Sequence, residues 1–159
     1  MKKTKCDAVK LEGGKKIIPI VKSLIKNKIP VMGHLGILPQ TEKKFSFKGK
    51  KLAERNRILK DAQLLEKAGI FSVVLECVET KLSKIITEIL KVPTIGIGSS
   101  VYCDGQVLVT DDLIGLSEKK FRFVKKFASA SKIINSAVKK YKSEVTKRQF
   151  PKAKHSFKN

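Results

Sequence analysis

Short apolar runs alternate with longer amphipathic stretches along most of this chain of 159 residues. The runs are rich in Val, Ile and Leu, and in the stretches between them apolar residues recur every three or four positions, as in helices. We expect strands near residues 7–12, 30–34, 71–76, 93–97 and 105–109. Nearly continuous apolar strands that alternate with helices predict a parallel sheet, either doubly wound or closed into a barrel.

Polar residues at the C-terminal ends of four expected strands distinguish between these two folds. Glu12, His34, Glu76 and the Gly98-Ser99 pair each stand at or just after the end of an apolar run. In α/β barrels that rim carries the active site, which is assembled from the ends of several strands. Four strands that deliver polar groups to one rim favour the barrel.

Length and composition predict one domain. A chain that is 42% hydrophobic can bury a sizeable core, and single domains cluster at roughly 100–150 residues. A last helix is expected from about Glu118 to Tyr141, and the basic tail 142–159 is expected to pack on or beside the rest. We therefore expect residues 1–159 to form a single domain.

The formal charge of +21 raises the question of nucleic-acid binding, because a basic stripe is the footprint of phosphate recognition. Residues 116–159 hold 14 Lys and Arg against 2 acidic residues, and the other basic residues are spread singly over helical stretches. The chain has no zinc-finger spacing, no aromatic RNA-binding motif and no Trp. A Lys-rich solvated surface is favoured, and nucleic acid is a disfavoured partner.

Three cysteines, Cys6, Cys77 and Cys103, form no CxxC pair and predict neither a disulfide framework nor a zinc site. The basic start is not followed by an apolar run of signal-peptide length, and no segment reaches the roughly 18 apolar residues that span a membrane. We expect a cytoplasmic protein that has no membrane partner.

Lys10 and Glu12 stand two residues apart on the first expected strand, so both side chains point to one face of the sheet. Charged side chains are almost never buried unless they are paired or bind something. A Lys and a Glu that enter the barrel together predict a functional site. The alternative is an ion pair that serves only the structure.

His34 and Glu76 end two further apolar runs. His34 lies between glycines in the segment GHLG. Its place at the rim indicates a functional role, and the alternative of a core histidine that serves only the packing stays open. Glu76 closes the run 71–75, where apolar neighbours should raise its pKa and suit it to act as a general base. The alternative for Glu76 is an ordinary acid that faces solvent.

The segment 96–100, with the sequence GIGSS, could hold a carboxylate or phosphate with backbone N–H groups. It matches neither GxGxxG nor GxxxxGK[ST], so nucleotide binding is not supported.

Six segments, taken together, resemble successive motifs of the ketopantoate hydroxymethyltransferase family, in the order of that family. They are AVKLEGG (8–14), VMGHLGILPQ (31–40), VVLECV (73–78), PTIGIGSS (93–100), CDGQVLV (103–109) and FPKAKHSF (150–157). The resemblance covers nearly the whole chain.

This resemblance implies a (β/α)8 TIM barrel, present here as a partial barrel with about the last five β/α units. It implies hydroxymethyl transfer from 5,10-methylenetetrahydrofolate to the 2-oxo acid 3-methyl-2-oxobutanoate, which gives 2-dehydropantoate on the way to pantothenate. It also implies a Mg2+ ion that holds the oxo acid, and a homo-oligomer, which is a decamer in the family.

The same resemblance assigns roles to four residues of this sequence. Glu76 matches the catalytic base that removes the C3 proton of the oxo acid. Glu12 matches the metal-associated acid, and Lys10 matches a lysine beside the substrate oxygens. His34 matches the histidine near the transferred carbon. These roles agree with the chemistry of enolisation, in which a divalent metal acts as a Lewis acid.

Three departures from the family pattern bear on these roles. The first three β/α units of the family, with two Asp metal ligands and a substrate-binding Ser, have no counterpart in these residues. The loop after Gln40 is shorter than usual, which affects part of the expected substrate lid. Asp111 stands where many members have a His before the Asp matched by Asp112.

Three hypotheses for the function follow. The chain is an active transferase if a partner chain supplies the N-terminal barrel units or if the oligomer tolerates their loss. It is otherwise a non-catalytic remnant. A basic nucleic-acid-binding module is the third and least favoured hypothesis. We expect the 159 residues alone to show little hydroxymethyl transfer.

Overall fold

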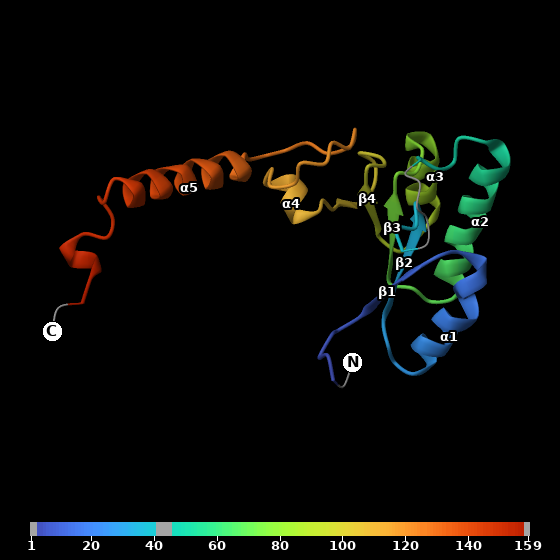
Figure 1. Ribbon diagram of the computed structural model, residues 1–159. Coiled ribbons are helices and arrows are strands. Elements are labelled where there is room, and N and C mark those ends of the chain that lie inside the picture. Colours follow the sequence, from blue (N-terminus) through green and yellow to red (C-terminus); the bar gives the residue numbers. More distant parts are fainter. Residues whose placement is uncertain (1–2, 41–45, 158–159) are drawn as a thin grey trace. The chain divides into compact units, whose positions relative to one another are not determined.

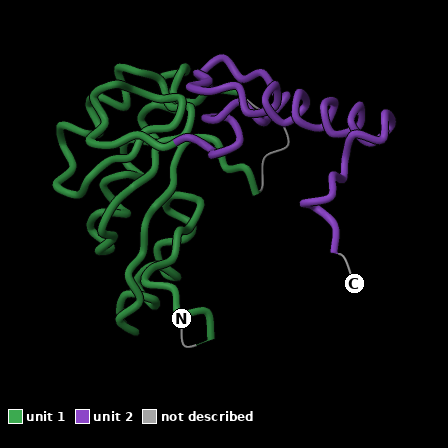
Figure 2. Tube along the Cα trace, turned by 90° about the vertical axis from the view of Figure 1, so that its left-hand side faces the viewer, with its two compact units in different colours: residues 1–107 green, residues 108–159 purple. Residues whose placement is uncertain are grey.

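The computed structural model (Figure 1) describes residues 3–40 and 46–157. It divides into two compact units, residues 1–107 and residues 108–159 (Figure 2), and each unit is described by itself. Residues 41–45, which belong to the shortened loop after Gln40, lie outside the described residues. The expectations for that loop and for a single domain with a basic tail stay predictions.

The first unit is built on a parallel sheet of five strands that follow one another in chain order. These strands are β1 Val9–Glu12, β2 Val31–Gly36, β3 Ser72–Glu76, β4 Thr94–Ile97 and β5 Gly105–Gln106. The five expected strands are therefore confirmed, and β5 is shorter than the range 105–109. The residues after it lead into helix α4, Thr110–Leu113, whose N-terminal cap is Val109.

Three helices cover one face of this sheet (Figure 1). They are α1 Ile18–Lys26, preceded by the 3-10 helix η1 Lys15–Ile17, then α2 Leu52–Lys67 and α3 Thr80–Ile89. Apolar side chains from these helices and from the covered face of the strands form one core, which includes Val21, Ala62, Leu65, Leu82 and Ile86 from the helices and Val31, Leu35, Val73 and Leu75 from the strands.

Strand order and helix placement together identify the fold. A doubly wound sheet reverses its strand order and carries helices on both faces. In the first unit the order does not reverse, and α1, α2 and α3 share one face. Both features are those of consecutive units of a (β/α)8 barrel, so the α/β fold of a partial barrel is confirmed.

The second unit holds α4, helix α5 Ala130–Thr146 and the 3-10 helix η2 Ala153–His155. The expectation of a helix from about Glu118 is wrong, because residues 118–129 form no helix. The backbone there bonds elsewhere: Phe127 N donates to Leu113 O at 2.8 Å, and Ala130 N donates to Ile114 O at 2.9 Å. These bonds tie the segment to the end of α4 and delay the start of α5.

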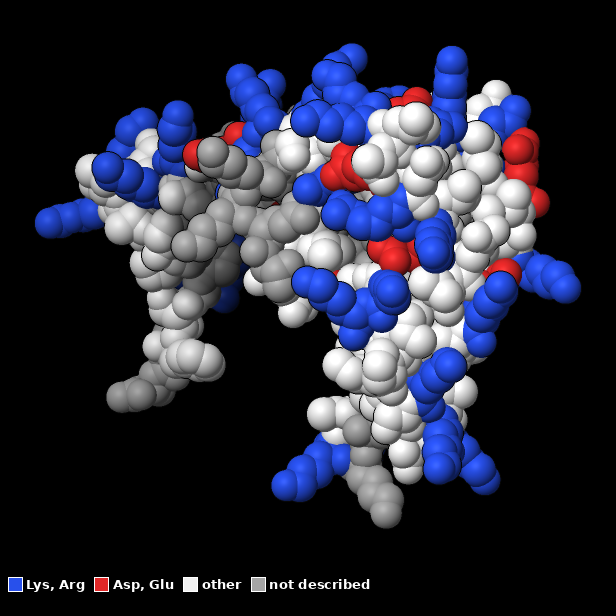
Figure 3. Space-filling model, turned by 90° about the vertical axis from the view of Figure 1, so that its right-hand side faces the viewer, with Lys and Arg blue, Asp and Glu red and all other residues white. Residues whose placement is uncertain are grey.

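Basic side chains are spread widely over the surface. On the face drawn in Figure 3, Lys and Arg are interspersed with acidic and uncharged residues and form no single stripe. This distribution agrees with a solvated Lys-rich surface. Among the helices of the described residues, none is both long and apolar enough to cross a membrane.

Candidate active site at the rim of the sheet

Strand register places four polar residues on one face of the sheet. Glu12 pairs with His34 across β1 and β2, and Gly36 pairs with Glu76 across β2 and β3. Paired residues of neighbouring strands share a face, and side chains two apart along a strand do so as well. Lys10, Glu12, His34 and Glu76 therefore lie on the face opposite the helices, and Glu12 and Glu76 are the last residues of their strands.

Val9 and Leu11 show why the first strand points this way. Both pack against the core under the helices, so Lys10 and Glu12 between and after them face the other side. Among the described residues no ion pair joins Lys10 to Glu12. An ion pair between these two, the structural alternative for this strand, is therefore not formed.

His34 is the most buried member of the group, with 1% of its surface exposed. Its Nε2 lies 2.9 Å from the Ile37 carbonyl oxygen and 3.2 Å from Glu76 Oε2. Both neighbours are acceptors, so we assign the ring proton to Nε2, which donates to them. Nδ1 is then an acceptor, and it is buried without a hydrogen-bond partner among the described residues.

Burial is the main reason why the pKa of His34 is lowered. The positive charge of Lys10 lowers this pKa further, whereas the charge of Glu12 and the hydrogen bond to Ile37 act in the opposite direction. His34 is therefore a neutral imidazole near pH 7, with one N–H group and one free lone pair.

Glu76 lies beside His34 with 12% of its side chain exposed. Burial raises the pKa of this carboxyl group, the charge of Lys10 opposes the rise, and the charge of Glu12 adds to it. Lys10 and Glu12 thus act electrostatically on both Glu76 and His34, as expected if the four form one cluster. The sequence predicted a raised pKa for Glu76 from its apolar neighbours, and burial is the largest cause of the rise.

Glycine at position 36 allows β2 and β3 to approach each other beside Glu76. Gly36 has φ +104°, and a Cβ atom there would lie 2.0 Å from the Glu76 carbonyl oxygen. Ile37 N then donates to the same carbonyl at 2.9 Å. This turn carries the Ile37 carbonyl oxygen back to His34, so the backbone that follows β2 fixes the imidazole.

Glu12 is the one expected metal ligand, and its carboxylate is the donor type that Mg2+ prefers. Its Oε2 accepts a hydrogen bond from Gln40 N at 3.2 Å. The described residues hold no group of three or more His, Cys, Asp or Glu that could bind a metal ion. The donor type fits Mg2+, and further oxygen ligands would have to come from elsewhere.

Two other segments singled out by sequence have mainly structural contacts. The Ser99 hydroxyl lies 2.6 Å from the Ser83 hydroxyl and donates to Val78 O at 3.1 Å, so it is engaged within the fold. Burial, followed by the charge of Glu76, raises the pKa of Cys77 to about 11, which keeps this thiol protonated at neutral pH. Neither residue offers a free nucleophile.

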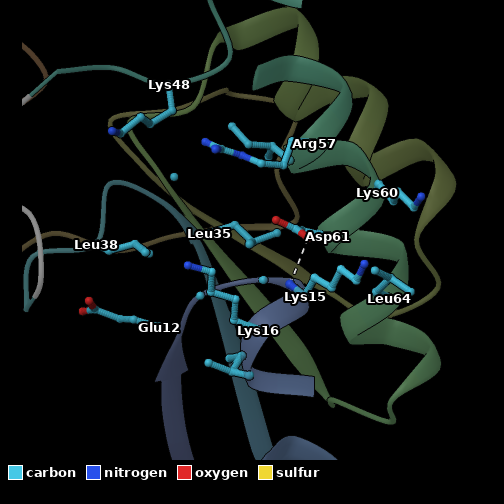
Figure 4. A pocket seen from close by; sticks show the side chains of 15 residues that line it. Glu12, Lys15, Lys16, Leu35, Leu38, Lys48, Arg57, Lys60, Asp61 and Leu64 are labelled. Atoms are coloured by element: carbon cyan, nitrogen blue, oxygen red, sulfur yellow. Dashed lines mark hydrogen bonds between the residues drawn. The ribbon is translucent and has the colours of Figure 1, made fainter. Parts of the chain in front are cut away.

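A cavity of about 670 Å3 opens beside Glu12, and sequence reasoning missed it. Its lining includes Lys16 of η1 and Arg57 of α2, which sequence patterns indicate only as exposed helix residues (Figure 4). One signal was available: Lys16 follows the Gly13-Gly14 pair directly after a strand end. Arg57 lies far away in sequence and gave no such signal.

Comparison with known proteins gives the family of this chain. A family model described as ketopantoate hydroxymethyltransferase matches residues 1–153. A protein of Pelagibacter ubique (strain HTCC1062) named 3-methyl-2-oxobutanoate hydroxymethyltransferase is 65% identical over 155 residues, which are 98% of this chain and 60% of that protein.

Relatives with the same name from other organisms also match nearly the whole of this chain. One from Clostridium botulinum (strain Langeland / NCTC 10281 / Type F) is 46% identical, over 99% of this chain and 59% of its own length. One from Pyrobaculum neutrophilum is 48% identical, over 96% of this chain and 60% of its own length. The chain therefore spans about 60% of the length of the curated relatives that it matches.

Proposed function

Because the chain belongs to the ketopantoate hydroxymethyltransferase family, we propose that it carries the catalytic rim for hydroxymethyl transfer from 5,10-methylenetetrahydrofolate to 3-methyl-2-oxobutanoate. The observation that carries this proposal is the carboxylate of Glu76, which is largely buried 3.2 Å from the neutral His34. The product is 2-dehydropantoate, and tetrahydrofolate is released.

Glu76 is the general base in this proposal. It takes the proton from C3 of the oxo acid, and the electrons of the C–H bond form the enolate. The enolate carbon then forms a C–C bond to the one-carbon unit, and the two C–N bonds that hold this unit to the folate break. Water supplies the hydroxyl oxygen of the product, and the proton from C3 and one proton of the water end on the two folate nitrogens. A raised pKa makes Glu76 a stronger base once it is ionised, which favours removal of a weakly acidic proton.

His34 and Lys10 support this step in different ways. The Nε2–H group of His34 donates to Glu76 and to Ile37 O, which holds the carboxylate in one orientation. The free Nδ1 lone pair can accept a hydrogen bond from the hydroxyl group of the product. Lys10 places a positive charge on the same face, where it can bind the carboxylate or enolate oxygen of the substrate.

Mg2+ bound by Glu12 would serve as a Lewis acid for the keto and carboxylate oxygens of the oxo acid. Glu12 contributes one carboxylate, so this proposal needs a partner polypeptide or segment that supplies the other ligands. We further propose a homo-oligomeric assembly in the cytoplasm, on the basis of the family and its metabolic reaction.

The test is exchange of the C3 proton of 3-methyl-2-oxobutanoate into D2O, because it reports enolisation without the folate. The chain is co-expressed with the part of the Pelagibacter ubique relative that it does not match. Glu76→Gln should lower the exchange rate by roughly 10²- to 10⁴-fold, the range for a lost general base. Glu88→Gln is the control, because Glu88 is an exposed acid on α3.

Exchange that persists in Glu76→Gln, or that falls equally in Glu88→Gln, would contradict the role of Glu76. Absence of exchange in the co-expressed assembly would favour the alternative, a non-catalytic remnant.

A further inference from the structure

The cavity beside Glu12 lies outside the group of Lys10, His34 and Glu76. It is formed by the loop after β1, the 3-10 helix η1, the end of β2 and one side of α2. Its volume of about 670 Å3 is in the range of small-molecule sites. Because Glu12 lines it as well, the cavity adjoins the candidate active site at the same rim.

The lining of this cavity is strongly basic. Five basic residues stand there against two acidic ones: Lys15, Lys16, Lys48, Arg57 and Lys60 against Glu12 and Asp61. Figure 4 shows the nitrogen ends of Lys16 and Arg57 directed into the hollow and that of Lys60 directed away from it.

The nearby acids do little to neutralise these two cations. Asp61 Oδ1 accepts a hydrogen bond from Lys15 N at 2.9 Å, so it is engaged in holding the backbone of η1. The ion pair of Arg57 with Glu54 is long, at 3.7 Å, and the other oxygen of Glu54 accepts from Gly49 N at 2.8 Å. Among the described residues, no ion pair involves Lys16.

Gly14 brings the basic groups close to one another. A Cβ atom at this position would lie 2.1 Å from the Asp61 carboxyl group. Glycine therefore lets η1 lie directly against α2, with Lys16 on one wall and Arg57 on the other (Figure 4). The cavity is thus a cleft between two elements with basic residues on both walls, and its charge fits an anion.

We infer that this cavity binds the carboxylates of the γ-linked glutamate tail of the folate co-substrate, an inference that rests on the proposed function. A folate has a reactive pteridine end and an anionic glutamyl end. The one-carbon unit has to reach the enolate formed beside Glu76. The opposite end then needs a cationic site near the same rim, and Lys16 and Arg57 provide one.

The test measures binding of 5-formyltetrahydrofolate with one, three or five glutamates, and of the analogue without glutamate, by titration calorimetry. The complete chain is used, alone and in the co-expressed assembly. Affinity should rise roughly threefold with each of the first added glutamates, the size of an exposed charge pair. The rise should shrink at high salt, because salt screens exposed charges.

Substitutions then locate the tail. Lys16→Gln and Arg57→Gln should flatten the dependence on glutamate number and leave binding of the analogue without glutamate unchanged. Lys60→Gln removes the same charge from the same helix as Arg57, but its side chain points away, so it should preserve the dependence. Circular dichroism spectra of each variant should match that of the unsubstituted chain, as expected for exposed positions.

An affinity that does not change along the glutamate series would overturn the inference. So would a dependence on glutamate number that Lys60→Gln flattens as much as Arg57→Gln does. Tri-γ-glutamate without pteridine separates this inference from the proposed function. If it binds through Arg57 while no folate binds, the cleft is a polycarboxylate site and the folate assignment is wrong. Proton exchange of the oxo acid is unaffected by either result, because the folate takes no part in it.

Discussion

At the scale of single residues, burial of Glu76 has opposite effects on catalysis and on stability. Its pKa is raised in the folded chain, chiefly by burial. A carboxyl group of this kind favours the folded state below its unfolded pKa, and this contribution is lost as pH rises through the folded pKa. At neutral pH the ionised Glu76 therefore lowers the stability of the chain.

Glu76→Gln should accordingly raise the midpoint of thermal unfolding at pH 7.5, although it lowers proton exchange in the co-expressed assembly. Gln cannot ionise, and its side-chain oxygen can still accept from His34 Nε2. The difference from the unsubstituted chain should vanish toward pH 4, where Glu76 is protonated. An unfolding midpoint that falls at pH 7.5 would show that the ionised carboxylate stabilises the fold.

His34 is expected to position Glu76 rather than to exchange protons itself. Its Nε2–H group donates to the carboxylate at 3.2 Å, and such a bond favours the ionised form. His34→Leu should therefore move the acidic limb of the exchange profile to higher pH and lower the rate about tenfold or more. His34→Gln keeps an amide N–H donor, so its acidic limb and its exchange rate should lie between those of His34→Leu and those of the unsubstituted chain. An unshifted acidic limb in His34→Leu would contradict this role.

The face of the sheet on which the four candidate residues lie could be predicted, but their contacts could not. Glu12 and Glu76 end their strands, Lys10 and His34 lie two residues before a strand end, and strand periodicity fixes the face on which all four lie. The acceptor for His34 is the backbone carbonyl of Ile37, which depends on the path of the chain after Gly36. No pattern of side chains encodes that path.

At the scale of elements, the close approach of the end of β2 to the end of β3 requires glycine at position 36. Gly36→Ala should destabilise the chain by about 2 kcal/mol or more, because φ is +104° and the new Cβ would meet the Glu76 carbonyl oxygen at 2.0 Å. Proton exchange should fall as well, since Glu76 would be displaced. Chemical denaturation followed by circular dichroism measures the loss.

Gly33→Ala is the matched control in the same strand. Its Cβ would meet only side-chain atoms, the nearest being Ile70 Cδ1 at 3.1 Å, which can shift. A cost for Gly36→Ala no larger than that for Gly33→Ala would show that the turn after β2 is not strained by a side chain.

The elements of the first unit were predicted well, and the start of the last helix of the second unit was not. Apolar runs and helical periods located the first four strands, because each element there packs on its neighbours in sequence. The expected helix from Glu118 failed at its start. Its apolar residues have helical spacing, but backbone bonds from Phe127 and Ala130 to the end of α4 outweigh that preference.

At the scale of the whole molecule, the sheet is a piece of a closed structure. In the described residues β1 and β5 each have one neighbouring strand. A barrel closes by pairing its first strand with its last, and an open edge leaves backbone N–H and C=O groups without ladder partners. The relatives are longer than this chain, which covers 60% of the Pelagibacter ubique protein.

The last prediction follows from this open sheet: the 159-residue chain by itself should show little or no proton exchange or hydroxymethyl transfer. Glu12 alone provides one carboxylate at the rim, and the described residues hold no metal-binding cluster. A hard cation usually needs further oxygen ligands beside substrate and water. Co-expression with the unmatched part of the Pelagibacter ubique relative should restore exchange, and Glu76→Gln in the restored assembly should abolish it again. Metal-dependent exchange by the chain alone, at the rate of the assembly and lost in Glu76→Gln, would show that the open edges and the single carboxylate suffice.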